Sequence, residues 1–110
     1  MKKLAVIAAL VSTPLAAQDG DPAAAVSEAR LRADVEAMVA FGTRHTLSEQ
    51  DNPKRGIGAA VDWGLAEMRR IGAACGGCLT VVAPERMVSG DRIPVPVRLR
   101  NAVAIQRGTE

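Results

Sequence analysis

The stretch that decides the fold is Ile93-Pro94-Val95-Pro96-Val97-Arg98-Leu99-Arg100-Asn101-Ala102-Val103-Ala104-Ile105. In residues 93–99 an apolar residue alternates with proline or arginine, the period of two that is typical of a strand. Pro94 and Pro96 lack a backbone donor, so we expect the first half to form an edge strand or an extended loop and the second half to pair. Residues 101–105 are almost continuously apolar, which is typical of a strand covered on both faces.

Two helices are predicted before these strands. Ser27 is a good N-cap for a helix over 28–41, which Gly42 should end in the left-handed conformation. Its expected core-facing stripe consists of Leu31, Val35, Met38 and Val39. A polar, aperiodic loop follows over 43–55. The second predicted helix has an apolar stripe that consists of Ile57, Ala60, Val61, Gly64, Leu65, Met68 and Ile71.

These elements predict the α/β class. A short strand is predicted over 79–82, limited by Pro84. The chain has 110 residues, enough for one small domain, and its 2% of aromatic residues predict a thin core. Too few elements are present to cover both faces of the 101–105 strand. We therefore expect residues 27–110 to be the opening part of a larger domain.

The first residues have the pattern of a secretory signal peptide. A positive Met1-Lys2-Lys3 precedes an apolar run over 4–15 and the small residues Ala16-Ala17. The run is too short for a membrane span and contains Pro14. We expect cleavage after residue 17, a flexible lead-in over 18–26, and a secreted or periplasmic product with no membrane anchor.

Charge and composition argue against nucleic-acid binding. The formal net charge is +2, with 14 Lys and Arg against 12 Asp and Glu, and loss of Lys2 and Lys3 with the leader makes the mature chain neutral. Nucleic-acid binding needs a basic surface and, for single strands, aromatic stacking platforms. We therefore expect no nucleic-acid partner.

The Cys75-Gly76-Gly77-Cys78 sequence favours a structural disulfide in an exported chain. A zinc site would need four ligands, and the chain has a single histidine. A thioredoxin-like redox pair would stand after a strand at the start of a helix, whereas this pair follows a helix and precedes a strand. The redox hypothesis predicts a lowered thiol pKa and disulfide-exchange activity.

Few residues suggest chemistry. His45 lies in the loop between Arg44 and Thr46, and we expect these three residues to have a structural or pocket-edge role. Glu49 and Asp51 are expected to be solvated. Gly56-Ile57-Gly58 could present N–H groups to an anion, but helix capping accounts for it equally well. No catalytic residue and no metal ligand is predicted in this chain.

Four segments together resemble exported bacterial zinc aminopeptidases related to leucyl aminopeptidase and aminopeptidase Y. They are Phe41-Gly42-Thr43-Arg44-His45-Thr46, Gly56-Ile57-Gly58-Ala59-Ala60 leading into Trp63, Cys75-Gly76-Gly77-Cys78, and Asn101-Ala102-Val103-Ala104-Ile105-Gln106-Arg107-Gly108. The resemblance covers about residues 28–110. It implies a family that removes N-terminal residues from peptides by means of two zinc ions and a glutamate base.

The resemblance implies that two N-terminal helices and then an antiparallel strand pair open a larger α/β/α sheet. It also implies that the family's zinc ligands follow the strand that corresponds to 101–107. The chain itself would then supply scaffold, bind no zinc and cleave no peptide, while the full-length protein would act on peptide substrates. An alternative is a small periplasmic binding or interaction domain with one structural disulfide.

Overall fold

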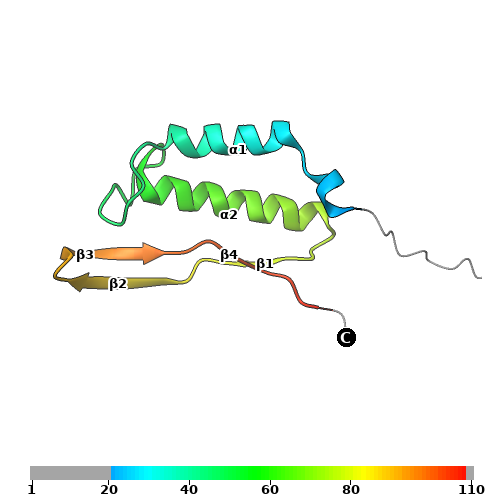
Figure 1. Cartoon of the computed structure of the whole chain (residues 1–110). Coiled ribbons are helices and arrows are strands. Elements are labelled where there is room, and N and C mark those ends of the chain that lie inside the picture. Colours follow the sequence, from blue (N-terminus) through cyan, green and yellow to red (C-terminus); the bar gives the residue numbers. More distant parts are fainter. Residues whose placement is uncertain (1–20, 109–110) are drawn as a thin grey trace, which may run out of the picture.

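In the computed structural model, which describes residues 21–108, two helices lie along one long antiparallel ribbon (Figure 1). The elements are the 3-10 helix η1 (Pro22–Ala25), the helices α1 (Glu28–Ala40) and α2 (Gly56–Ala74), and the strands β1 (Thr80–Val82), β2 (Glu85–Gly90), β3 (Ile93–Arg100) and β4 (Val103–Ile105). The predicted class, two helices followed by antiparallel strands, is confirmed. The predicted signal peptide, residues 1–17, lies outside the described residues. The predicted flexible lead-in contains η1, whose first turn is capped by the Asp21 side chain.

α1 begins and ends where the sequence predicts. The Ser27 hydroxyl oxygen accepts a hydrogen bond from the Arg30 N–H at 3.2 Å, which satisfies one of the free donors of the first turn. At the other end Phe41 is the C-cap, and Gly42 follows with a φ of 67°. Only glycine adopts this left-handed conformation without steric cost, so Gly42 fixes the end of the helix.

The four strands form two successive pairs of a single ribbon. β1 pairs with β4, and β2 pairs with β3, both antiparallel. At the junction between the pairs the Asn101 N–H donates to the Pro84 carbonyl oxygen at 3.1 Å, so the chain continues directly from one pair to the next. The ribbon is therefore one long hairpin whose turn lies at residues 91–92.

β2 was not predicted, whereas β1 ends at Val82, before Pro84, in agreement with the predicted short strand over 79–82. β2 lacks a clear period of two in its sequence, Glu85-Arg86-Met87-Val88-Ser89-Gly90. It is a strand because it pairs with β3. The second half of β3 pairs as predicted, from Val97 to Arg100, whereas in the first half only Ile93 has a pairing partner on β2. Pro94 and Pro96 are two residues apart, so their missing donors fall on the same strand edge, and the pairing has an irregularity between Val88 and Gly90 opposite them.

α2 packs on one face of this ribbon. A Cβ added at Gly72 would lie 3.2 Å from the Leu79 Cβ, and one added at Gly64 would lie 3.6 Å from the Ala102 Cβ. The buried apolar residues of the described chain, Ala59, Ala60 and Leu65, are all in α2. The core is thin, as predicted, and it is built around this one helix.

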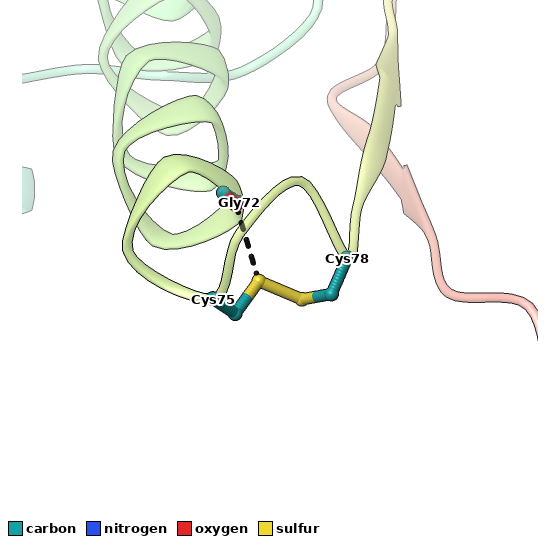
Figure 2. The surroundings of a disulfide bond; sticks show 3 residues. All are labelled: Gly72, Cys75 and Cys78. Carbon is teal, nitrogen blue, oxygen red and sulfur yellow. Dashed lines mark hydrogen bonds between the residues drawn. A yellow bond between two sulfur atoms is a disulfide. The ribbon is translucent and has the colours of Figure 1, made fainter.

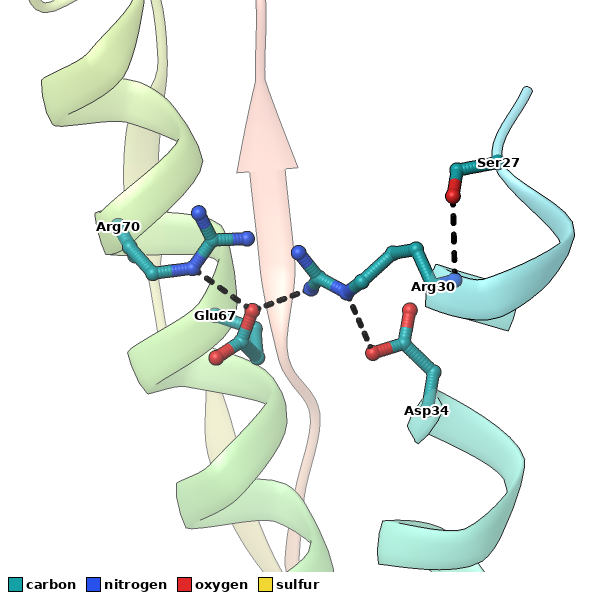
Figure 3. Close-up of polar contacts among 5 residues, drawn as sticks. All are labelled: Ser27, Arg30, Asp34, Glu67 and Arg70. Atoms are coloured by element: carbon teal, nitrogen blue, oxygen red, sulfur yellow. Dashed lines mark hydrogen bonds and ion pairs between the residues drawn. The ribbon is translucent and has the colours of Figure 1, made fainter. Parts of the chain in front are cut away.

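An ion pair between Arg30 and Glu67 joins α1 to α2 (Figure 3). The Arg30 guanidinium donates to both Asp34 and Glu67, and Arg70 also donates to Glu67 at 3.0 Å. Near the C-terminal end of α1, the Phe41 and Trp63 rings lie 6.3 Å apart between centroids. No residue of α1 is buried.

The predicted core-facing stripe of α1 is wrong in this respect. Leu31, Val35 and Val39 are 55%, 62% and 65% exposed, and Met38 alone of the four is half-buried. The half-buried residues Asp34 and Ala37 are displaced around the helix from Leu31, Val35 and Val39.

Candidate functional site

The loop of residues 41–55 holds the start of α2 by capping its first three N–H groups. Gly56 N–H donates to the Phe41 carbonyl oxygen at 2.9 Å, and Gly58 N–H donates to the Glu49 carbonyl oxygen at 3.1 Å. Between them, Ile57 N–H donates to the Ser48 hydroxyl at 3.0 Å. Because the loop uses all three donors, they are not available to a bound anion, and capping explains the glycines here. No local sequence motif marks Ser48 as a helix cap, because its partner Ile57 lies nine residues away.

Arg44, His45 and Thr46 lie in this loop, and two of them shape it. His45 Nδ1 accepts a hydrogen bond from the Leu47 N–H at 2.9 Å, so the neutral ring carries its proton on Nε2. The His45 carbonyl oxygen accepts from the Ser48 N–H, and the Thr46 carbonyl oxygen accepts from the Gln50 side-chain amide. The side chain of His45 is exposed, whereas Arg44 and Thr46 are half-buried.

A hollow of ≈ 620 Å³ opens beside the loop, between the end of α1 and the start of α2. Phe41, His45, Glu49 and Arg55 all contribute to its wall, so His45 is at a pocket edge. Glu49 accepts hydrogen bonds from Arg55 Nε and from the Asn52 amide, each at 2.6 Å. The hydrogen bond from Arg55, then that from Asn52, lowers the pKa of Glu49, and the same carboxylate raises the pKa of Arg55.

This loop does not have the composition of a metal centre. Within residues 21–108 no group of three or more His, Cys, Asp or Glu side chains gathers. Glu49 is occupied by Arg55 and Asn52, and Asp51 accepts from Arg98 of β3 at 2.7 Å. These residues do not fit a zinc ion, so we assign no catalytic step to them.

The cysteine pair lies between α2 and β1, as predicted from its position. The structure joins Cys75 and Cys78 in a disulfide with a Cα–Cα distance of 5.6 Å. Cys75 Sγ lies 3.2 Å from the Gly72 carbonyl oxygen (Figure 2). A disulfide sulfur has no proton to donate, so this contact is one of packing. The disulfide encloses the turn that passes from the helix to the ribbon.

The two faces of the ribbon differ sharply, and side-chain contacts identify the face toward α2. On β3, Arg98 reaches Asp51, and Arg100 donates to the Asp62 carboxylate at 2.8 Å and to the Gly58 carbonyl oxygen. Two residues further on, Ala102 is the neighbour of Gly64 in α2. Because side chains alternate along a strand, the odd-numbered residues from 95 to 105 lie on the opposite face.

That opposite face is mostly apolar and has no covering layer within residues 21–108. Together with the residues paired to it on β1 and β2, it consists of Thr80, Val82, Pro84, Arg86, Val88, Val95, Val97, Leu99, Asn101, Val103 and Ile105. Val95 is 66% exposed and Ile105 is 47% exposed. The expected cover on both faces of the 101–105 strand is therefore present on one face only. We call these residues the outer ribbon face.

Within residues 21–108, no helix combines the length and the apolar character that a membrane crossing requires.

The sequence is similar to several fungal proteins named as probable zinc metalloproteases. It is 48% identical over 94 residues to one from Pyricularia oryzae, which covers 82% of this chain and 19% of that protein. Over 86 residues it is 45% identical to one from Leptosphaeria maculans and 42% identical to one from Pyrenophora teres f. teres. Both alignments cover 77% of this chain, and they cover 20% and 18% of those proteins.

The chain thus spans about a fifth of the length of these relatives. No model of a known protein family matches it, and no solved structure matches it significantly. The relatives' names support a segment related to zinc metalloproteases. They do not specify removal of N-terminal residues.

Proposed function

We propose that this chain is the N-terminal scaffold segment of a secreted zinc-dependent exopeptidase, an aminopeptidase that acts on peptide substrates. In this proposal residues 1–17 direct export. The zinc ions, two according to the family resemblance, are held by residues elsewhere in the protein. The chain alone neither binds zinc tightly nor hydrolyses peptides.

The observation that carries the proposal is the outer ribbon face. A sheet face of this size and apolar character is a site of association, because soluble proteins rarely expose large contiguous apolar patches. The 42–48% identity to probable zinc metalloproteases, of which the alignments cover only 18–20%, supports a metalloprotease body as the source of the covering layer.

A segment exchange tests the proposal. Residues 26–108 would replace the matching segment of the full-length Pyricularia oryzae relative, and zinc content and hydrolysis of an amino-acid p-nitroanilide would be measured against the unmodified relative. We expect the chimera to retain zinc and hydrolysis within about tenfold, because a matching scaffold leaves the distant ligands in place. The N-acetylated form of the same substrate should resist, since an aminopeptidase requires the free amine.

The matched control is the 110-residue chain alone, which should retain no zinc after dialysis and show no hydrolysis. A chimera that folds but lacks the zinc and activity of the unmodified relative would contradict the scaffold proposal. Cleavage of the acetylated substrate at an equal rate would contradict the aminopeptidase part and leave the metalloprotease part.

A further inference from the structure

We infer that Leu31, Val35 and Val39, the α1 stripe, dock against an apolar helix in the zinc-bearing body of the metalloprotease. The inference rests on the proposed function, and it adds a second contact surface distinct from the outer ribbon face. It concerns a flank of α1, the helix that α2 separates from the ribbon in Figure 1.

The α1 stripe is an unused apolar surface on an otherwise well-formed helix. Its three members are 55–65% exposed, although α1 has a proper N-cap and C-terminal glycine. The half-buried residues Asp34, Ala37 and Met38 lie on the neighbouring side, toward α2. The apolar arc of α1 is thus wider than the contact with α2 requires, and part of it remains open.

The shape of this surface suits a helix. Residues spaced by four form a ridge along a helix, and such ridges pack into the grooves of a second helix in the commonest class of helix pairing. A shallow groove of ≈ 330 Å³ lies beside the ridge, lined by Leu31 and Val35 and by the side chains of Glu28, Arg32 and Glu36. A row of β-branched and leucine side chains with charged residues along one border is the usual pattern of a protein contact.

The charges at the border favour a protein partner over a lipid surface. Glu28 and Glu36 flank the groove together with Arg32, and Glu28 lies 3.8 Å from Arg32 as an ion pair. Helices that bind membrane surfaces carry an excess of Lys and Arg on their polar border. Since four-fifths of the relatives' length lies outside this chain, that body provides the covering helix.

The test uses Val35→Lys in the chimera described above, with Ala33→Lys as the matched control. Ala33 is also exposed on α1, and it lies two residues and therefore about 200° from Val35 around the helix. Both variants are also made in the 110-residue chain. Lysine is a better helix former than valine, so the substitution at Val35 does not weaken α1 itself.

We expect Val35→Lys to lower the thermal midpoint of the chimera by at least about 3 °C, whereas Ala33→Lys leaves it unchanged. In the 110-residue chain neither variant should change the midpoint, because Val35 is already exposed there. Amide hydrogen exchange over residues 31–39 should be slower in the chimera than in the chain alone, by at least about tenfold.

Three results would overturn the inference. Equal midpoints for the two chimera variants would show that nothing packs on the α1 stripe. Concentration-dependent dimerisation of the 110-residue chain that Val35→Lys abolishes would identify a second copy as the occupant. Vesicle binding that the same variant abolishes would identify a membrane.

Loss of zinc and activity in the unsubstituted chimera would count against the proposed function instead, and the midpoint comparison would still decide the docking. If the chimera does not accumulate, the 110-residue chain is co-expressed with the part of the relative that it does not match. Co-purification that Val35→Lys disrupts and Ala33→Lys does not would support the inference. Absence of any co-purification would refute it.

Discussion

α2 and the preceding loop approach each other closely at Gly58. This predicts that replacement of glycine by alanine has opposite effects at two positions in the same helix. A Cβ added at Gly58 would lie 1.8 Å from the Gln50 carbonyl oxygen and 2.5 Å from the Gln50 carbonyl carbon. At Gly64 the nearest atom would be the Ala102 Cβ at 3.6 Å, an ordinary van der Waals contact. We therefore expect Gly58→Ala to destabilise the chain and Gly64→Ala to stabilise it.

The magnitude follows from the contacts that the loop makes. Real Cβ atoms do not approach within 3.0 Å, so the loop must withdraw by about 1.2 Å, the difference from 1.8 Å. This movement weakens the hydrogen bonds from Ile57 to Ser48 and from Gly58 to Glu49. Two such bonds contribute about 1–3 kcal/mol, and alanine recovers up to about 1 kcal/mol of helix propensity, leaving a net loss of about 1–2 kcal/mol.

Gly64→Ala gains the higher helix propensity of alanine without a steric clash, so the free energy of unfolding should rise by about 0.5–1 kcal/mol. Both variants are measured in the 110-residue chain by urea unfolding, followed by far-ultraviolet circular dichroism. Unfolding free energies for Gly58→Ala equal to or above wild type would refute the close approach of the loop. A loss of stability for Gly64→Ala would refute the ordinary 3.6 Å spacing between Gly64 and Ala102.

Three other predictions concern the disulfide, the core and the α1–α2 contact. Reduction of the Cys75–Cys78 disulfide should lower the free energy of unfolding by about 2 kcal/mol without unfolding the chain, because the loop that the disulfide closes is short. Unfolding curves recorded with and without dithiothreitol measure this difference. Loss of all helical signal on reduction would show that the disulfide does more than enclose a turn. Leu65→Ala should lower the free energy of unfolding by about 2–4 kcal/mol, because the Leu65 side chain is 4% exposed and belongs to a thin core. As a control, Ile71→Ala should lower it by well under half as much in the same assay, because Ile71 is exposed. The hydrogen bond from Arg70, and then that from Arg30, lowers the pKa of Glu67 from its ordinary 4.5, so this carboxylate stabilises the fold above that pH and loses its effect as the pH falls through the lowered pKa. Glu67→Gln should therefore flatten the fall in stability between about pH 5 and 3 relative to wild type, and an unchanged pH profile would contradict the contact.

The sequence predicted the helices well because their signals are local. Ser27 and Gly42 lie at the ends of α1, and both act within one turn of the backbone. It also placed the cysteine pair correctly between helix and strand. The candidate loop was predicted as a loop with His45 at a pocket edge, since its polar residues show no periodicity.

Contacts between distant residues could not be predicted in the same way. β2 has no strand pattern of its own and is defined by its pairing with β3. Ser48 caps a helix nine residues away, and no local motif marks such a cap. Arg98 and Arg100 were expected only as the polar half of an alternating strand, but they join the ribbon to the loop and to α2.

The sequence by itself determined which segments are helical, where α1 ends, and that the 101–105 strand is apolar on both sides. Tertiary structure decided which of those apolar surfaces are covered. Within residues 21–108, α2 covers one ribbon face, and no described segment covers the α1 stripe or the outer ribbon face. The physical reason is that apolar periodicity specifies that a face is to be buried, but the packing partner of that face is set by the whole fold.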